Sequence, residues 1–323
     1  MTASHPDEQR SQIVQGRFDD IDALADAALD WDQEYHQIGR GRFHGELTQL
    51  VLGQVQLNRE QWETGVLQSG AAPEGTWVFG LPLRADGPLH VRRQPVRDGE
   101  LLAATSSDDV GFVAEGATDL MIVVLPNSLI NRWMRARRGI DGIDADLPPR
   151  HWVVSSLEMA RRSRLLFTLQ NELVNSGDAE MTSRLIAHVE ARISETIFDL
   201  IPSAETVESL PSRARIAREV LRVLHDRLDD PPTVTALCED VGARERTLYL
   251  SCVEAFGRPP AQLLLELRLN AVRRALASPA LGTTVTGAAS RFGFTHLGRF
   301  SSMYARQFGE LPSATLAESL GSN

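Results

Sequence analysis

The stretch from Thr283 to Pro312 decides the fold of the C-terminal part of the chain. Its core reads Thr284-Val-Thr-Gly-Ala-Ala-Ser-Arg-Phe-Gly293-Phe-Thr-His-Leu-Gly-Arg299-Phe-Ser-Ser-Met-Tyr304-Ala-Arg-Gln-Phe308-Gly309. The pattern predicts helices over residues 285–292 and 295–308, joined at Gly293, where the missing Cβ permits a left-handed turn. The inward face of the second helix consists of aromatic residues four positions apart, Phe300, Tyr304 and Phe308. This is the plan of a helix-turn-helix unit that contacts the major groove of DNA with its second helix.

A partial copy of this unit lies upstream. It reads Thr233-Val-Thr-Ala-Leu-Cys-Glu-Asp-Val-Gly242-Ala-Arg244-Glu-Arg246-Thr-Leu248-Tyr249-Leu-Ser-Cys-Val-Glu-Ala-Phe256-Gly257. Gly242 corresponds to Gly293 and Gly257 to Gly309, while the exposed residues differ. We expect one scaffold used twice, to recognise two different DNA sequences. The helix between the copies, residues 260–278, is apolar on two sides and about 27 Å long, comparable with the ~34 Å between successive major-groove faces.

The distribution of charge agrees with a DNA-binding C-terminal part. The net charge of −10 argues by itself against nucleic acid, but residues 213–323 hold 14 Arg and 11 Asp or Glu. A sign change between the two ends is typical of chains that bind nucleic acid at one end. All 33 basic residues are arginine, whose guanidinium suits phosphate and guanine.

The first two-thirds of the chain predict a second, β-rich domain, so the fold class is α+β. From Phe43 the pattern alternates: odd positions such as Leu47 and Val51 are apolar, and even positions such as Thr48 and Gln56 are polar. Further short strands separated by Asp-Gly and Glu-Gly turns predict a barrel or sandwich that can hold one small ligand. The expected parts are a disordered tail (1–16), a β-rich domain (17–150), a helical hairpin (151–201), a linker (202–212) and the DNA-binding domain (213–318).

The hairpin is expected to do more than pack on its own domain. Its two helices, over residues 153–175 and 179–200, have apolar faces too wide for an isolated pair. They must pack on the β-rich domain, on a second copy of the chain, or on both. We expect a homodimer interface here, with intramolecular packing alone as the alternative.

Metal-binding residue types occur in the β-rich part without a metal-binding pattern. His36, His44, His90 and Glu46 include no His-x-His pair, so histidines on the surface or in hydrogen bonds are the preferred interpretation. No metal and no other cofactor is expected.

The two cysteines, Cys238 and Cys252, are expected to be reduced packing residues. With no signal peptide and no apolar run near 18 residues, the sequence predicts a cytoplasmic protein without a membrane partner.

The most specific pattern combines three groups of residues in the C-terminal part. They are Gly242, Leu248 and Phe256-Gly257; Arg268-Leu269, Ala271 and Arg274-Ala275-Leu276; and Gly293-Phe294, Phe300 and Phe308-Gly309-Glu-Leu-Pro312. Over residues 213–316 this pattern resembles the AraC/XylS family of bacterial transcription regulators. The resemblance implies a non-enzymatic, dimeric activator that binds double-stranded DNA and works with RNA polymerase. It also implies that an N-terminal domain, often a cupin-like barrel with a helical hairpin, senses a small-molecule effector.

The family's motif also implies which residues contact DNA. The expected groove-facing residues are Arg244, Arg246, Thr247, Tyr249 and Leu250 in the first unit, and His296, Gly298, Arg299, Ser301 and Ser302 in the second. Arg246 and Arg299 are the leading candidates for bidentate guanine contact, with phosphate as the alternative. Arg244 stands where the family has a capping Ser, and Leu250 where a polar residue is common. Arg268, among leucines, is expected to form a buried ion pair.

Two other functions remain open. A repressor that needs no ligand differs only in regulation. A DNA-binding enzyme of the alkyl-transfer repair type would need a nucleophilic cysteine, usually in a zinc cluster, whereas Cys238 and Cys252 are placed as packing residues.

Overall fold

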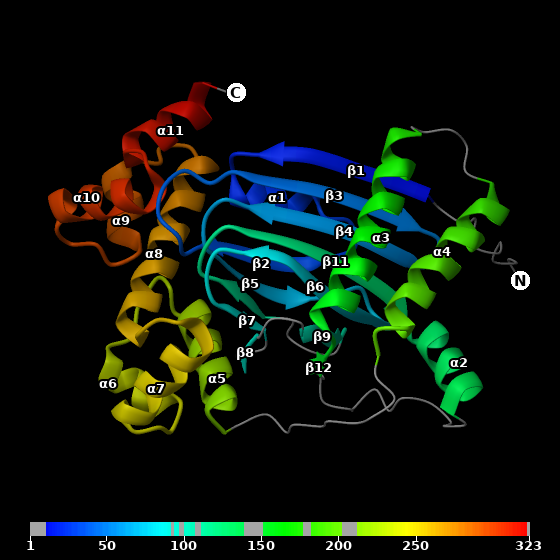
Figure 1. Cartoon of the computed structure of the whole chain (residues 1–323). Helices are drawn as coiled ribbons and strands as arrows, with labels where there is room; N and C mark the ends of the chain where they lie inside the picture. Colours follow the sequence, from blue (N-terminus) through cyan, green and yellow to red (C-terminus); the bar gives the residue numbers. More distant parts are fainter. Residues whose placement is uncertain are drawn as a thin grey trace, which may run out of the picture.

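The computed structural model describes residues 11–91, 94–96, 100–106, 111–138, 151–176, 182–201 and 212–321. A β-rich N-terminal part lies beside an all-helical C-terminal part (Figure 1), so the α+β prediction is confirmed. Residues 202–211 of the expected linker and residues 1–10 of the expected tail lie outside the described residues.

A seven-stranded antiparallel sheet is the larger of two sheets in the N-terminal part. Its order is β1 (Ser11–Phe18), β3 (Gly45–Leu52), β4 (Val55–Trp62), β11 (Thr118–Pro126), β6 (Thr76–Ala85), β9 (Glu100–Thr105), β12 (His151–Val153). The prediction of a disordered tail through residue 16 was wrong from Ser11 onward, because β1 pairs along its whole length with β3.

A five-stranded antiparallel sheet faces the first. Its order is β2 (Asp32–Gln37), β5 (Val66–Ala71), β10 (Phe112–Ala114), β7 (Leu89–Val91), β8 (Gln94–Pro95). Trp62 and Ile122 of the first sheet share a core with Val66 and Phe112 of the second. The family resemblance implied a closed cupin-like barrel, and that part of the prediction was wrong. The described strands form two separate sheets packed face to face.

Within the described residues, four helices accompany the sheets: α1 (Ile21–Ala27), α2 (Asn127–Arg138), α3 (Ser156–Asn175) and α4 (Ser183–Phe198). The predicted hairpin helices, α3 and α4, cross the larger sheet on the side away from the smaller one (Figure 1). Leu166 of α3 and Ile193 of α4 are buried in one core with Leu57 and Val123 of the sheet. The intramolecular packing expected for the hairpin is thus present.

The C-terminal part consists of seven described helices, α5 (Ser212–Asp226), α6 (Val234–Asp240), α7 (Glu245–Phe256), α8 (Pro260–Ala277), α9 (Val285–Arg291), α10 (Leu297–Phe308) and α11 (Pro312–Gly321). The two predicted helix pairs are α6–α7 and α9–α10, one near each end of α8 (Figure 1). Leu263 and Leu267 of α8 belong to the core of the first pair. Val272 and Leu276 belong to the core of the second, so the two-sided apolar pattern is confirmed.

The two parts of the chain are joined by direct contacts. Gln37 at the end of β2 donates its backbone N–H to Asn270 Oδ1 of α8 at 2.9 Å, and Asn270 Nδ2 donates to the Gln37 carbonyl at 2.9 Å. Ile38 and Leu67 of the N-terminal part share a core with Leu224 of α5. The helical part is therefore docked on the smaller sheet.

Candidate nucleic-acid interface

The first helix-turn-helix unit has the local geometry that its sequence predicted. Thr233 caps α6, because its Oγ1 accepts from the Ala236 N–H at 3.1 Å. Gly242 turns the chain with φ of 62°, a region that residues with a Cβ rarely adopt. Leu248 and Phe256 are buried and fix the inner face of α7. The opposite face of α7 is left to the surface.

The second unit is built in the same way. Gly293 turns the chain with φ of 76°. Phe300, Tyr304 and Phe308 are all buried, which confirms the predicted inward stripe. Their rings pack edge to face, with centroids 5.7 Å apart for Phe300–Tyr304 and 4.6 Å for Tyr304–Phe308. The hydroxyl groups of Tyr304 and Thr315 lie 2.8 Å apart, a hydrogen bond that ties α10 to α11.

Arg268 of α8 holds the corner of this second unit. Its Nε donates to the Phe292 carbonyl at 2.6 Å, and its guanidinium carbon lies 4.4 Å from the centre of the Phe294 ring. Burial lowers the pKa of Arg268. The expected ion pair is wrong, because among the described residues the partners of Arg268 are a carbonyl group and an aromatic ring rather than a carboxylate.

The ten predicted contact residues lie on the outer faces of the two second helices and the turns before them. Seven are exposed, and Thr247, Leu250 and Ser301 are half-buried. In the part of the chain that the structure describes, Arg246 and Arg299 form no ion pair. Arg227, by contrast, forms an ion pair with Asp240, with Nη1 2.9 Å from Oδ2. The guanidinium groups of Arg246 and Arg299 therefore remain available for a phosphate or a base edge.

The N-termini of both recognition helices carry a feature that sequence reasoning noted only in part. Arg244 is the N-cap of α7 and His296 the N-cap of α10, and neither side chain caps its helix in the described structure. The first N–H groups of a helix without a side-chain cap, together with the helix dipole, favour an anion. The departure noted at Arg244 was the signal for α7; nothing comparable marked His296.

Known proteins resemble this chain most in the region just described. The family described as "Helix-turn-helix domain" matches residues 237–318. The XylDLEGF operon transcriptional activator of Pseudomonas putida is 24% identical over 227 residues, covering 68% of this chain and 67% of its own length. The probable thc operon regulatory protein of Rhodococcus erythropolis is 33% identical over 115 residues, covering 35% of this chain and 34% of its own. The chain belongs to the AraC/XylS family.

Solved structures of similar chains include further AraC-type proteins. A probable AraC family transcriptional regulator from Rhodopseudomonas palustris is 30% identical and covers 32% of this chain and 97% of its own, with a TM-score of 0.31. The AraC-like transcriptional activator CuxR is 14% identical and covers 77% of this chain and 86% of its own, with a TM-score of 0.36. The relatives found by sequence are transcription regulators, so this AraC/XylS-family chain is a DNA-binding regulator rather than an enzyme.

The cysteines of this AraC/XylS-family chain fit that conclusion. Cys252 is fully buried, and burial raises the pKa of its thiol to about 12. Burial also raises the pKa of Cys238. A thiol that stays protonated at neutral pH is a poor nucleophile, so the alkyl-transfer alternative lacks its reactive group. No described helix combines the length and the hydrophobicity needed to span a bilayer.

A cavity of about 50 Å³ lies between the two sheets of the regulator. Aromatic and aliphatic side chains line it together with the polar Glu60 and Tyr35. Tyr35 Oη donates to Glu60 Oε2 at 2.6 Å. Glu60 is 3% exposed, and burial raises its pKa to about 7 although the bond from Tyr35 lowers it. Among the described residues no cationic side chain pairs with Glu60, and Trp62 Nε1 beside it has no hydrogen-bond partner.

The contact between this cavity and the DNA-binding part passes through β2. The side chain of Tyr35 lines the cavity, and its backbone carbonyl accepts from Arg274 Nη2 of α8 at 2.6 Å. Arg274 Nε also donates to Asp22 Oδ1 at 2.9 Å, and Arg274 pairs with Glu34. Sequence reasoning placed Arg274 in the family's motif without predicting these partners, since they lie about 240 residues earlier in the chain.

The residues considered for a metal are not brought together as a set. His44 Nδ1 lies 2.5 Å from Asp19 Oδ1, and Glu46 pairs with Arg17. His90 lies on β7, and burial lowers its pKa. His36 is instead fully buried against His225 of α5.

Proposed function

We propose that this chain is a sequence-specific transcription activator that contacts two neighbouring major-groove segments of one promoter with α7 and α10. The main support is that both helices have exposed faces with arginines that form no ion pair among the described residues, while α8 links the cores of the two helix pairs. Its 18 residues span about 27 Å at ~1.5 Å per residue, of the order of one turn of DNA. The naming of the Pseudomonas putida relative as an operon transcriptional activator supports activation.

In this proposal Arg246 and Arg299 recognise bases, and the uncapped helix N-termini bind phosphates. Arginine can donate to guanine O6 and N7 at once, which is worth about 1–3 kcal/mol of discrimination. Thr247, Ser301 and Ser302 offer hydroxyl groups on the same faces, although Ser302 Oγ donates to the Gly298 carbonyl at 3.1 Å. Tyr249, which is 49% exposed, supplies contact with a thymine methyl or a phosphate.

The cavity between the sheets is the proposed effector site. Glu60 is a buried carboxylate whose partner is a hydroxyl group, so an anionic ligand would add a second negative charge at low dielectric. A ligand with a positive charge or a hydrogen-bond donor would compensate it, and the rings of Trp62 and Phe112 favour a cation. The effector then acts on α8 through Tyr35 and Arg274, whose contacts connect the two parts.

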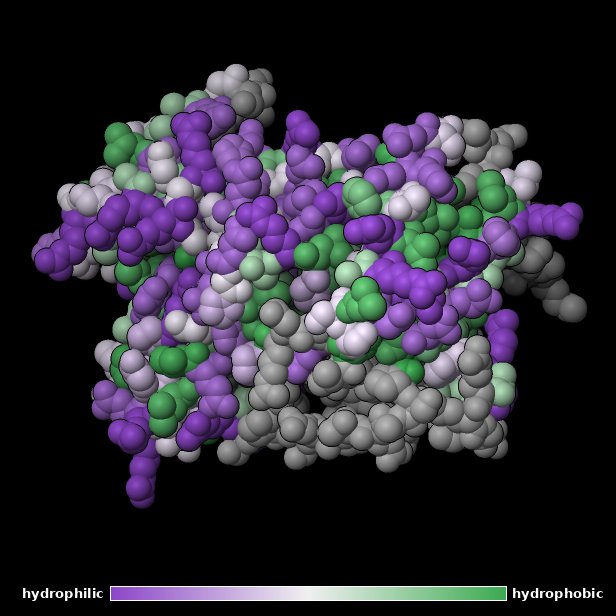
Figure 2. Space-filling model, viewed as in Figure 1, coloured by the Kyte–Doolittle hydropathy of each residue, from purple (hydrophilic) through white to green (hydrophobic). Residues whose placement is uncertain are grey.

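The outer face of the α3–α4 hairpin is the proposed homodimer interface. Leu157, Leu165 and Leu185 are 78%, 42% and 44% exposed there. Figure 2 shows hydrophobic patches among hydrophilic residues in this region. The inner face packs on the sheet, and in this proposal the outer face packs on a second copy of the chain. Sedimentation of Leu157→Glu with Leu165→Glu tests this: a folded monomer is expected, whereas an unchanged dimer contradicts the proposed interface.

Selection of binding sites from random duplex DNA, followed by footprinting, tests the DNA-binding proposal. The full chain is expected to select two conserved blocks centred about 10 base pairs apart, because two docked helices one turn apart face the same side of the duplex. Selection of a single short block would contradict it. A promoter reporter separates the activator from the ligand-independent repressor, since the two change transcription in opposite directions.

A further inference from the structure

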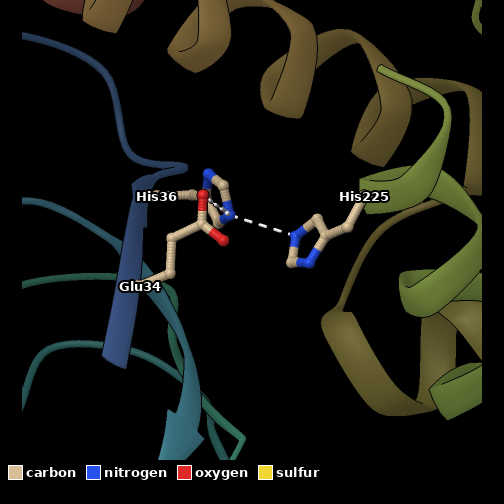
Figure 3. Close-up of side chains that lie close together, drawn as sticks. All are labelled: Glu34, His36 and His225. Atoms are coloured by element: carbon tan, nitrogen blue, oxygen red, sulfur yellow. Dashed lines mark hydrogen bonds and ion pairs between the residues drawn. The ribbon is translucent and has the colours of Figure 1, made fainter. Parts of the chain in front are cut away.

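Three side chains that can bind a metal meet where the two parts of the chain are docked. Glu34 and His36 come from β2, and His225 comes from α5 (Figure 3). Nε2 of His36 lies 3.1 Å from Nε2 of His225 and 3.6 Å from Glu34 Oε1. The ligand atoms of all three residues lie within 4.8 Å of one another.

The two imidazole rings face each other with their nitrogen atoms. Their centroids are 5.1 Å apart and their planes are inclined by 42°, so the rings do not stack. His36 is fully buried, and in a pair of neutral imidazoles one N–H can donate to the other nitrogen. A nitrogen-to-nitrogen approach at this distance is also the arrangement of two ligands on one metal ion.

The distances match the coordination of a zinc ion. Two ligand atoms, each about 2.0–2.1 Å from Zn²⁺ at a tetrahedral angle, lie roughly 3.3–3.4 Å apart. The separations of 3.1 Å and 3.6 Å lie on either side of this value, so these two pairs need movements of only a few tenths of an ångström. The ligand atoms of Glu34 and His225 lie within 4.8 Å of each other, and rotation of the Glu34 side chain can bring them closer. The side chain of Glu34 is 44% exposed, which gives an ion a path from solvent.

Arg274 beside the cluster is compatible with a cation there. Its charge is offset by Asp22 and Glu34, with which it forms ion pairs. Arg274 pairs with Oε1 of Glu34, the same atom that lies 3.6 Å from His36 Nε2. Each carboxylate oxygen has more than one lone-pair site, so Oε1 can accept from Arg274 and bind a metal at the same time, and Oε2 offers a second ligand atom. The contact from Arg274 Nη2 to His36 Nδ1 is long, at 3.5 Å, so little is lost when it breaks. Ligation of a metal through Nε2 places the ring proton on Nδ1, which can then no longer accept from Arg274.

We propose that Glu34, His36 and His225 bind a divalent transition-metal ion of the Zn²⁺ class, with water in the fourth position. Imidazole nitrogen with one carboxylate is a ligand set that suits Zn²⁺ and its neighbours rather than Mg²⁺ or Ca²⁺. Two ligands belong to the N-terminal part and one to the DNA-binding part. The ion therefore binds the docked arrangement and holds α5 against β2.

Metal content of the full-length chain tests the proposal. Protein stripped with a chelator is dialysed against Zn²⁺, then against metal-free buffer, and analysed for zinc. The wild type is expected to retain one more ion per chain than His225→Ala. His188→Ala is the matched control, because His188 is an exposed histidine of α4, and it is expected to retain zinc like the wild type.

Cobalt gives a second measurement that does not depend on one variant. Co²⁺ in a tetrahedral nitrogen–oxygen site absorbs visible light, so the wild type and His188→Ala are expected to show bands that His225→Ala lacks. Glu34→Gln is expected to weaken Zn²⁺ binding about 10–100-fold. Absence of the bands from the wild type, or equal zinc retention by wild type and folded His225→Ala, would overturn the proposal. If His225→Ala does not fold, the wild-type spectrum and Glu34→Gln decide.

Discussion

Single arginines of the C-terminal part differ in what they already contact. Arg222 forms ion pairs with Glu219 and Asp226 on its own helix. Arg268 donates a hydrogen bond to a carbonyl group and lies over an aromatic ring. Arg246 and Arg299 were chosen from their position in a motif, and the structure leaves both exposed. A charged group that is fully solvated before binding has no internal contact to break when it meets DNA.

Replacement of Arg246 by alanine is expected to weaken binding selectively at one base pair of the selected site. The loss should be about 1–3 kcal/mol on the preferred base and smaller on the others. Fluorescence anisotropy with site variants and random duplexes measures it, with Arg222→Ala as the control. Equal losses on every duplex, with the salt slope reduced by about one unit, would assign Arg246 to a phosphate.

Glu60 should make stability depend on pH. Because burial raises its pKa from 4.5 to about 7, the folded state holds a proton that the unfolded state releases earlier. Its contribution is complete below about pH 4.5 and is lost as pH rises through about 7, a change of roughly 3 kcal/mol. Urea midpoints at pH 5 and pH 8 should fall less with pH in Glu60→Gln than in the wild type. The exposed Glu63→Gln should behave like the wild type, and an unchanged pH dependence in Glu60→Gln would contradict this.

At the scale of helices and turns, the two turn glycines, Gly242 and Gly293, differ in how much space surrounds them. A Cβ on Gly293 would lie 2.8 Å from Arg268 Nη2, whereas at Gly242 nothing lies within 4 Å of it. Both have positive φ, so alanine costs about 1–2 kcal/mol of backbone strain at either position.

Gly293→Ala is therefore expected to lower the free energy of unfolding more than Gly242→Ala does. Gly298→Ala serves as the control, because Gly298 lies inside α10 with open space around it and should gain up to about 1 kcal/mol. Denaturant unfolding of the three variants measures the order. Equal losses at the two corners would mean that Arg268 moves aside without cost.

Helices were easier to predict than strands, for a physical reason. The helix expected over residues 260–278 is found as Pro260–Ala277, since its apolar positions repeat with the helical period. Strand β2 was missed, because Asp-Gln-Glu-Tyr-His-Gln shows no apolar alternation. His36 and Gln37 are buried there by His225 and Asn270, which lie 189 and 233 residues away. Such burial depends on tertiary contacts that a local pattern does not contain.

The candidate sites also differ in how far the sequence could predict them. The outward faces of α7 and α10 could be predicted, because a duplicated motif fixes which side of each helix points outward. An interior that can hold one small ligand could also be predicted, but its polar lining could not. Gln56 is 4% exposed and Glu60 is 3% exposed, although Gln56 belongs to the polar positions of the alternating pattern. The second sheet covers the face of the first sheet on which these polar residues lie. Alternation of polar and apolar residues usually indicates a face in solvent, but here the polar face borders the space between the two sheets.

At the scale of the whole molecule, the docking of the two parts depends on few charged groups. Arg274 contacts Asp22, Glu34 and the Tyr35 carbonyl, and Arg273 Nη1 donates to Asp20 Oδ2 at 2.8 Å. Neutral contacts also join the two parts, among them those of Gln37 with Asn270 and Gln307 and the packing of Ile38. Loss of Arg274 leaves two carboxylates without their cation.

Arg274→Ala is expected to weaken docking by roughly 1–3 kcal/mol, the range for hydrogen bonds to charged groups that lose a partner. Small-angle X-ray scattering should then show a larger radius of gyration. Arg222→Ala, whose partners lie on its own helix, should leave the radius unchanged. An unaltered radius in Arg274→Ala would mean that the remaining contacts, including Arg273 with Asp20, hold the two parts together without Arg274.

The shared helix α8 has a consequence for the promoter itself. Because its two ends belong to the cores of different helix pairs, the protein has no hinge there with which to adjust its reach. Its span of about 27 Å falls short of the ~34 Å repeat of the double helix. In the proposed binding mode, curvature of the duplex toward the protein absorbs the difference, and flexible steps between the two contacted blocks are expected to be favoured even where no side chain touches them.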